Sequence, residues 1–414
     1  MTAREQARAG KRAWQQAILT DKSRRTVLER TAELIDERRD TISKANRQDM
    51  QRAEAEATAT AVLDRLLLTD ARIDGMIQGL HEVAAIPDPL DKTLDEWTLE
   101  NGLRIRKVTV PLGLIGIIYE ARPNVTIEAA SLIFRAGNAV ILRGGSAAAD
   151  SNQALVACFQ DALREHDLNP LLIQHLEDGS RASGLELMQA HDYVDVLVPR
   201  GSRSLIDQVI RDATVPVIQT GDGNCHLYVA ASADPAMALE LTINAKMQRC
   251  SVCNAVETLL VDTQIASRFL PLLAEALAGQ CELRLDPTAR EILGDDYPAA
   301  TEEDWATEYN DTILAIRVVD GLEEALEHIR LYSTQHSEGI VTEDREEAER
   351  FLQLVDAAAV YHNASLRFTD GGVFGFGGEL GISTQKLHAR GPMGVEALVS
   401  YKYRVYGDGQ IRSS

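Results

Sequence analysis

The feature that most constrains the fold is a regular alternation of short apolar runs and amphipathic segments between residues 110 and 225. LGLIGIIY, AVILRGG and VDVLVPRGS have the length of buried strands, and VPVIQTGDG is expected to close the series. IEAASLIFRAGN, SNQALVACFQDALREHD and SLIDQVIRDA have helical spacing. This order predicts a parallel sheet covered by helices on both faces. Ligands of such sheets bind beyond the carboxyl ends of the strands.

The rest of the chain divides into four further segments. Residues 1–92 have the three- and four-residue apolar spacing of helices, and WTLENGLRIRKVTVP alternates around an Asn101-Gly102 turn, which predicts a hairpin. A second α/β block, residues 226–363, contains the strand-like runs HLYVA, VETLLV, ILAIRVV, GIVTED and AAVYHN. A Gly-rich segment over 364–394 then leads to a final strand in ALVSYKYRVYG. The expected fold class is therefore α/β with parallel sheets.

Charge and length exclude several classes of function. The 414 residues carry a net charge of −21, from 42 basic and 63 acidic side chains, so the surface repels nucleic acid and anionic lipid. No apolar run approaches the ~18 residues of a membrane span. The Arg-rich start, MTAREQARAGKRAWQQAIL, could mimic a transit peptide, but a first amphipathic helix is favoured. Five cysteines, an odd number in a long chain, suggest reduced thiols and a cytoplasmic location.

The stretch RCSVCN, residues 249–254, contains two cysteines in C-x-x-C spacing. A zinc site needs four ligands, and the neighbours Cys225 and His226 would fit poorly in one tetrahedron, so no metal site is expected. A redox dithiol usually follows a strand early in a small βαβ domain, whereas this pair lies deep in a long chain. A single nucleophile, Cys253, fits better because it lies at a helix or strand boundary with Arg249 nearby. From spacing alone, a buried structural Cys253 is an equal alternative.

Two strand ends resemble phosphate-binding loops, although G-x-G-x-x-G is missing after the first strand. Glycine lets a backbone approach a phosphate, and a following helix offers free N–H groups, but Gly-Ser is also an ordinary helix cap. A third cluster, in ISTQKLHARGP, concentrates basic groups, which suits either a solvated loop or an anion site. The candidate residues are Arg143, Gly144, Gly145, Ser146, Arg200, Gly201 and Ser202 at the strand ends, and Lys386, His388 and Arg390 in the basic cluster.

The chain as a whole resembles the aldehyde dehydrogenase superfamily and, within it, the γ-glutamyl phosphate reductases. The stretches that carry this resemblance are PLGLIGIIYEARPNVT, NAKMQRCSVCNAVETLLV, TEYNDTILAIRVVD and NASLRFTDGGVFGFGGELGISTQKLHARGPMG. The resemblance runs end to end. It implies an NADP-binding domain over 110–225 with helices 1–92, and a catalytic domain over 226–363. It also implies an oligomerisation element from 93–109 and 395–414, with 364–394 as a substrate or hinge segment.

The resemblance assigns roles to individual residues. Cys253 matches the catalytic cysteine, and Cys250 falls where relatives usually have proline. Asn124 matches an asparagine that helps to hold an oxyanion, and Glu308 matches a glutamate that binds the nicotinamide ribose. Gln219 stands where hydrolytic relatives have the glutamate that acts as general base, but Glu120, a carboxylate near Asn124 in sequence, is an alternative base. The expected cofactor-binding residues are Arg143, Gly144, Gly145, Ser146, Gly201, Ser202 and Glu308, and the expected substrate-binding residues are Arg122, Lys386, His388 and Arg390.

The implied activity is NADPH-dependent reduction of L-glutamyl 5-phosphate to L-glutamate 5-semialdehyde through a cysteine thioester, in proline biosynthesis. The expected partners are further copies of the chain and a glutamate 5-kinase that supplies the substrate. A coenzyme A-acylating aldehyde dehydrogenase remains an alternative, because Gln219 permits it. A hydrolytic enzyme is disfavoured by Gln219, and a silent binding subunit by the presence of Cys253 and Asn124.

Overall fold

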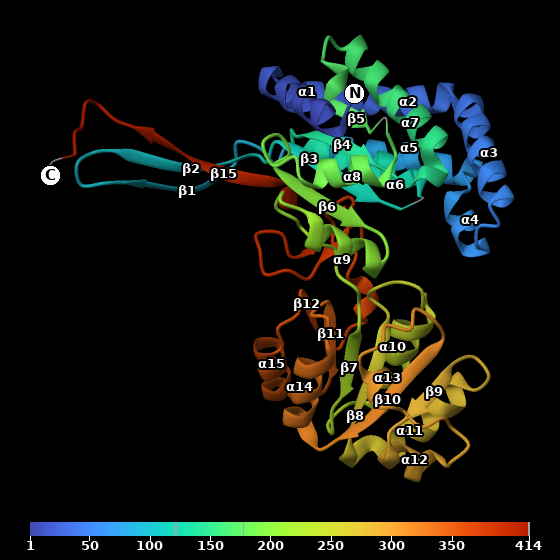
Figure 1. Cartoon of the computed structure of the whole chain (residues 1–414). Helices are drawn as coiled ribbons and strands as arrows, with labels where there is room; N and C mark the ends of the chain where they lie inside the picture. Colours follow the sequence, from blue (N-terminus) through green and yellow to red (C-terminus); the bar gives the residue numbers. More distant parts are fainter. Residues whose placement is uncertain (121, 177, 413–414) are drawn as a thin grey trace. The chain divides into compact units, whose positions relative to one another are not determined.

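The computed structural model describes residues 1–120, 122–176 and 178–412, which fall into two compact units (Figure 1). The first unit comprises residues 1–220, 375–381 and 393–414, and the second comprises 221–374 and 382–392. The chain passes between the units at residues 220–221, a few residues before the predicted boundary at 225–226. Each unit is described by itself below.

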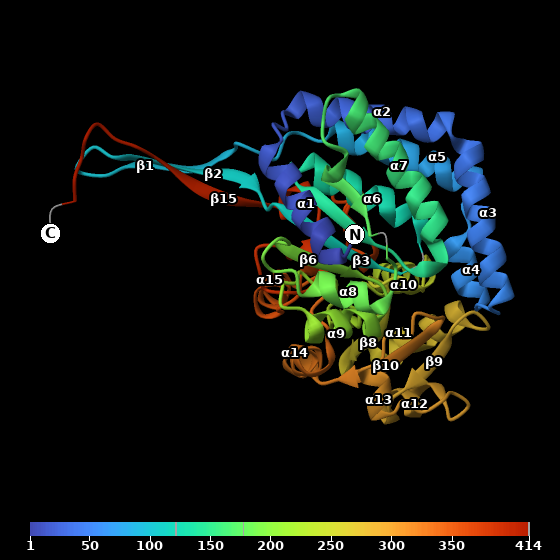
Figure 2. The ribbon, with the colours of Figure 1, turned by 45° about the horizontal axis from the view of Figure 1, so that its top comes forward.

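The N-terminal region of the first unit is helical, as its apolar spacing predicts. Three of its helices begin at threonines, Thr2, Thr20 and Thr69, whose side chains each accept a backbone N–H of the first turn. Helix α2 packs against α5 and α7 (Figure 2). It therefore lies on the layer of helices beside the first sheet. The helices are α1 (Ala3–Gln16), α2 (Asp21–Glu37), α3 (Arg39–Ala55), α4 (Thr60–Leu66) and α5 (Asp70–Ala85).

A four-stranded parallel sheet forms the centre of the first unit, which confirms the predicted βαβ series. Its order is β5-β4-β3-β6, so β3 has neighbours on both sides and the strand order reverses there. The expected final strand in VPVIQTGDG is only an isolated bridge between Leu197 and Val217, and the short β5 was not predicted. The elements are β3 (Leu114–Tyr119), α6 (Pro123–Arg135), β4 (Ala139–Arg143), α7 (Ala149–Glu165), β5 (Ile173–His175), α8 (Arg181–Met188), β6 (Val196–Arg200) and α9 (Arg203–Asp212).

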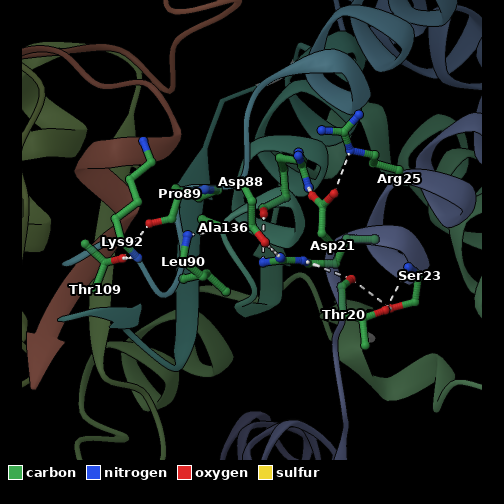
Figure 3. Close-up of polar contacts among 12 residues, drawn as sticks. Thr20, Asp21, Ser23, Arg25, Asp88, Pro89, Leu90, Lys92, Thr109 and Ala136 are labelled. Carbon is green, nitrogen blue, oxygen red and sulfur yellow. Dashed lines mark hydrogen bonds and ion pairs between the residues drawn. The ribbon is translucent and has the colours of Figure 1, made fainter. Parts of the chain in front are cut away.

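Two buried arginines connect the N-terminal helices to this layer. Arg24 of α2 is 1% exposed, binds Asp88 at 2.7 Å and donates to the carbonyl of Arg135 at 3.2 Å. Arg135, which ends α6, pairs in turn with Asp21 at 2.6 Å. Asp21 also binds Arg25 at 3.0 Å (Figure 3). Because buried charges are costly unless they are paired, these contacts fix the position of α2 on α6.

A three-stranded antiparallel arm belongs to the same unit. It consists of β1 (Thr93–Thr98), β2 (Arg104–Pro111) and β15 (Val399–Tyr406), in the order β1-β2-β15. The turn between β1 and β2 contains Gly102 at φ +87°, which confirms the predicted hairpin. Figure 1 and Figure 2 both show the three strands extending together away from the helices of this unit. Trp97, Tyr401 and Tyr403 are exposed along it and pack edge to face.

The second unit contains a six-stranded parallel sheet in the order β12-β11-β7-β8-β10-β9. The five predicted strands of the 226–363 block are all present, and β9 is an additional short one. The strands are β7 (Cys225–Val229), β8 (Val256–Asp262), β9 (Glu282–Leu285), β10 (Ile313–Val319), β11 (Ser337–Val341) and β12 (Ala359–His362). The helices are α10 (Pro235–Met247), α11 (Thr263–Leu277), α12 (Pro287–Leu293), α13 (Glu302–Trp305), α14 (Gly321–Tyr332) and α15 (Arg345–Leu354).

The Gly-rich segment is divided between the units. The antiparallel pair β13 (Ile382–Ser383) and β14 (Gly391–Pro392) belongs to the second unit, whereas residues 375–381 belong to the first. Short 3₁₀ turns complete the chain: η1 (Ser146–Ala148), η2 (Pro170–Leu172), η3 (Leu366–Phe368) and η4 (Val395–Leu398). Among the described residues, no helix combines the length and apolar character needed to cross a membrane.

Candidate active site

Cys253 lies in a turn between α10 and β8, at the amino end of β8. The turn is closed by the N–H of Ala255, which donates to the carbonyl of Val252 at 3.0 Å. Cys253 is partly exposed, as a nucleophile that must reach a substrate has to be. The prediction that Cys253 lies at a helix–strand boundary is therefore confirmed.

Three contacts fix this turn within the second unit. The thiol of Cys225, at the start of β7, donates to the carbonyl of Cys253 at 3.2 Å. The same carbonyl lies so close to Gly223 that an added Cβ would be 1.4 Å from its oxygen. The side-chain amide of Asn254 donates to the carbonyl of Thr369 at 2.8 Å. The peptide that carries the candidate nucleophile is therefore held on both sides.

Glu308 is tied to the same place through Gly223. Its carboxylate accepts the backbone N–H of Gly223 at 2.9 Å, so one glycine contacts both the Cys253 carbonyl and the Glu308 side chain. A side chain at position 223 would disturb both contacts. The structure thus brings together two residues, Cys253 and Glu308, that the sequence places 55 positions apart.

Cys253, Glu308 and the glycine that contacts both lie at the amino ends of the parallel strands of the second unit. Gly223 precedes β7, Cys253 precedes β8 and Glu308 precedes β10. This is the opposite edge from the one at which open α/β sheets usually bind ligands. The general rule therefore applies to the loops of the first sheet and not to the nucleophile.

Both cysteines of the C-x-x-C stretch interact with thiols from other parts of the chain. The fully buried Cys225 interacts electrostatically with Cys253, and burial raises the pKa of the Cys225 thiol well above its usual value. Burial likewise raises the pKa of Cys281 to about 11, and Cys250 is among the charges that act on it. Among the described residues there is no group of three or more His, Cys, Asp or Glu side chains placed to hold a metal ion.

Arg367 is a residue that sequence reasoning missed. It follows β12 in η3, and burial, then Arg249, lower the pKa of its guanidinium, while the Cys253 thiol raises it. Its Nε donates to the side chain of Gln248 at 2.9 Å. Two cations, Arg249 and Arg367, thus lie near the Cys253 turn, although only Arg249 is close in sequence.

In the first unit, the candidate cofactor residues meet at the carboxyl ends of β3, β4 and β6. Tyr119 of β3 pairs in register with Arg200 of β6, and Ile118 pairs with Arg143 of β4. The hydroxyl of Ser202 donates to the carboxylate of Glu120, which also lies against Gly201. A side chain on Gly144 would be 2.3 Å from the amide nitrogen of Asn152. The predicted grouping of these strand ends is confirmed within the unit.

A cavity of about 350 Å³ opens at this edge. Three guanidiniums line it, from Arg65, Arg122 and Arg143, and none forms an ion pair with a carboxylate in the described part of the chain. Burial lowers the pKa of Arg122 and of Arg143. The remaining lining residues are Val62, Tyr119, Glu120, Gly145, Ser146, Ala147 and Leu205. Glu120 lines the same cavity and acts electrostatically on Arg122, but three guanidiniums that form no ion pair among the described residues are suited to a bound anion such as a phosphate.

Sequence reasoning missed Arg65 and assigned Arg122 to the substrate. Arg65, on α4, lies 78 positions before Arg143 and has no motif around it. Arg122 was predicted to bind substrate together with Lys386, His388 and Arg390, but it lines the cavity that contains the cofactor candidates Arg143, Gly145 and Ser146. Asn124 follows Arg122 at the start of α6, where its amide donates to Glu128 at 2.8 Å and keeps a second N–H for another acceptor.

The basic cluster near residue 386 is partly neutralised. Lys386 binds Asp356 at 2.6 Å and Arg390 binds the same carboxylate at 2.9 Å. These two cations lower the pKa of Asp356. His388 is exposed beside them. The structure thus brings Lys386 and Arg390 together, as predicted, but with an acidic partner that the sequence pattern did not reveal.

The site and both sheets agree with comparisons to known proteins. Residues 1–286 match the model of the aldehyde dehydrogenase family. A gamma-glutamyl phosphate reductase of Enterococcus faecalis is 51% identical over 96% of this chain and 95% of its own length. Another, from Moorella thermoacetica, is 55% identical over 92% and 91%. A crystal structure of gamma-glutamyl phosphate reductase from Thermotoga maritima is 46% identical, covers 100% of both chains and has a TM-score of 0.97.

The two parallel-sheet units have the fold of the aldehyde dehydrogenases. The chain belongs to the aldehyde dehydrogenase family and, within it, to the gamma-glutamyl phosphate reductases.

Proposed function

We propose that this chain reduces L-glutamyl 5-phosphate to L-glutamate 5-semialdehyde and phosphate with NADPH, as a step of proline biosynthesis. The observation that carries the proposal is the fixed Cys253 turn, in a chain half identical to gamma-glutamyl phosphate reductases over nearly its whole length. A cytoplasmic location and supply of the substrate by a glutamate 5-kinase are parts of the same proposal.

In this mechanism the thiolate of Cys253 attacks the acyl carbon, and the C–O bond to phosphate breaks. The resulting thioester is reduced by hydride, which the nicotinamide cofactor supplies when it is bound. The backbone N–H of Cys253 and the amide of Asn124 hold the oxyanion, and a donor of this kind contributes roughly 3–4 kcal/mol. Collapse of the oxyanion expels the thiolate and releases the semialdehyde.

Two features support reduction rather than hydrolysis or acyl transfer to coenzyme A. Gln219 cannot accept a proton at neutral pH, so it cannot activate a water against the thioester. The proposed anchors for the phosphate and α-carboxylate of the substrate are Lys386, His388 and Arg390, whereas Arg122 lines the cavity proposed below for the cofactor's phosphates. Arg390→Ala removes one of these cations and should raise the Michaelis constant of phosphate or semialdehyde. The expected rise is only several-fold, because Asp356 already offsets two of the charges. Unchanged constants would remove Arg390 from the site.

The reverse reaction separates the alternatives. Reduction of NADP with glutamate 5-semialdehyde is measured with phosphate, with coenzyme A, and with neither. Strict dependence on phosphate that is lost in Cys253→Ser supports the proposal. Turnover without phosphate indicates a hydrolytic enzyme, turnover only with coenzyme A indicates the acylating alternative, and no turnover indicates a binding subunit.

The cavity in the first unit is the proposed site of the cofactor's phosphates. Arg143 donates from one Nη to the carbonyl of Gly179 at 3.1 Å, and its buried Nε has no partner among the described residues. A guanidinium with an open edge can bind the 2′-phosphate of NADPH. Gly144, Gly145, Ser146, Gly201 and Ser202 would form the surrounding loops, and Glu308 would bind the nicotinamide ribose. Equal use of NADH and NADPH by the wild type would contradict the role of Arg143.

The arm formed by β1, β2 and β15 is the proposed contact with further copies of the chain. Its two edge strands have unpaired backbone groups, and exposed aromatic side chains lie along it. Trp97→Asp together with Tyr403→Asp should convert an oligomer to a monomer in sedimentation velocity. A monomeric wild type would refute this assignment.

A further inference from the structure

A fully buried ion pair joins two residues that flank the candidate nucleophile in the sequence. Lys246, in the last turn of α10, contacts the carboxylate of Glu257 on β8, and both side chains have 0% exposure. Replacing such a pair by apolar residues of similar volume is often neutral or stabilising. Stability alone therefore gives no reason for two charges at this position.

The pair joins the two ends of the nucleophile segment. Lys246 lies seven residues before Cys253 and Glu257 lies four residues after it. Their contact therefore holds the two ends of this segment together. Glu257 is also the extra residue of a β-bulge, because Val256 pairs with Cys225 whereas Thr258 pairs with the next residue, His226. A bulge turns a side chain away from the regular alternation of a strand. Here the bulge lies at the carboxylate that binds Lys246.

The second oxygen of Glu257 reaches the segment that contains Glu308. It accepts the backbone N–H of Asn310 at 3.3 Å, and Asn310 has φ +54°. The Nζ of Lys246 lies 5.8 Å from the ring centroid of Tyr309. Both residues directly follow Glu308, whose carboxylate binds Gly223. One ion pair therefore joins the segment that contains Cys253 to the segment that contains Glu308.

We propose that Lys246 and Glu257 are positioning residues that hold the Cys253 turn and the Glu308 segment in one fixed arrangement. This inference rests on the proposed function for the meaning of that arrangement, but the contacts themselves lie within the second unit. Removing the pair should allow the two segments to move independently. Chemistry at Cys253 should then slow, while recognition of the substrate by other residues changes little.

The test compares Lys246→Met, Glu257→Gln and the double variant. The double variant replaces the ion pair by two uncharged side chains of similar size. Burial raises the pKa of Glu257 to about 7, with Lys246 opposing the rise, so Glu257 can become neutral when Lys246 is removed and the fold should survive. Phe351→Leu is the matched control, because Phe351 is buried in a different core cluster of the same unit. Melting temperature, kcat, both Michaelis constants and the alkylation rate of Cys253 by iodoacetamide, followed by peptide mass spectrometry, are measured.

All three variants should lower kcat at least tenfold and slow Cys253 alkylation several-fold, with the Michaelis constant of semialdehyde within threefold of wild type. The double variant should melt near the wild type and still be slow, whereas Phe351→Leu should melt lower with normal kcat. A double variant with wild-type kcat and alkylation rate overturns the proposal. If the wild type lacks phosphate-dependent turnover, the proposed function fails, and the alkylation rates still decide whether the pair positions Cys253.

Discussion

Gly223→Ala is the substitution for which the structure predicts the largest loss of activity from the smallest chemical change. A Cβ at this position would lie 1.4 Å from the Cys253 carbonyl oxygen and 2.7 Å from the Cys253 Cα, both of them backbone atoms. The turn would have to move by about 2 Å to restore ordinary contact. Misplacement by 1 Å can cost roughly 100-fold in rate, so kcat should fall at least about 100-fold, or about 2.7 kcal/mol in activation free energy.

The assay is phosphate-dependent semialdehyde oxidation, with circular dichroism to confirm that the variant is folded. Gly221→Ala is the control in the same segment, because the three atoms nearest its added Cβ all belong to the side chain of Thr384 and none to the backbone. That side chain can adjust, so the expected loss is less than tenfold. If the folded Gly223→Ala variant kept kcat within threefold of wild type, the close approach of Gly223 to the nucleophile would not matter for the chemistry.

Two further predictions concern stability. Asp88→Asn removes the carboxylate partner of the buried Arg24, and because Asp88 is itself partly exposed, the free energy of unfolding should fall by roughly 2–3 kcal/mol in urea denaturation; a change below 0.5 kcal/mol would contradict the role given to this pair. Burial lowers the pKa of His336 to about 4 from its usual 6.5, so the folded state resists protonation, and the stability this contributes is present above pH 6.5 and lost as pH falls towards 4. The free energy of unfolding should therefore fall by about 2–3 kcal/mol less between pH 7 and pH 4.5 in His336→Gln than in the wild type. If the free energy of unfolding depended on pH identically in both proteins, His336 would not be the group responsible.

Most elements of the fold could be predicted because their periods are local properties of the sequence. Alternation and Asn101-Gly102 identified the hairpin, and long apolar runs identified the central strands. The two missed strands, β5 and β9, have only three and four residues, so they carry no readable period. VPVIQTGDG has strand-like composition, but its backbone makes only an isolated bridge through Val217. In that case tertiary context outweighed residue preference.

The candidate site was predictable where a motif is contiguous and not where it depends on contacts across the chain. Cys253 stands in a short recognisable stretch, whereas Arg65 and Arg367 have no pattern around them and are identified only by where the chain brings them. Asp356 is a further example, because the basic residues near it were visible in the sequence but their acidic partner was not. The density of Lys386 and Arg390 in the sequence suggested an open anion site, but the carboxylate that binds both lies 30 and 34 positions away.

The cysteines show why spacing in sequence is weak evidence for pairing in space. Cys250 and Cys253 are three residues apart, yet the thiol that contacts the Cys253 peptide is Cys225, on a neighbouring strand. Because the pKa of the Cys225 thiol is raised by burial, it stays protonated at neutral pH and can donate to the Cys253 carbonyl. A protonated, buried donor is suited to holding a backbone and not to redox exchange, since exchange requires a thiolate. The thiol that supports the candidate nucleophile Cys253 therefore comes from another part of the chain and not from the C-x-x-C stretch.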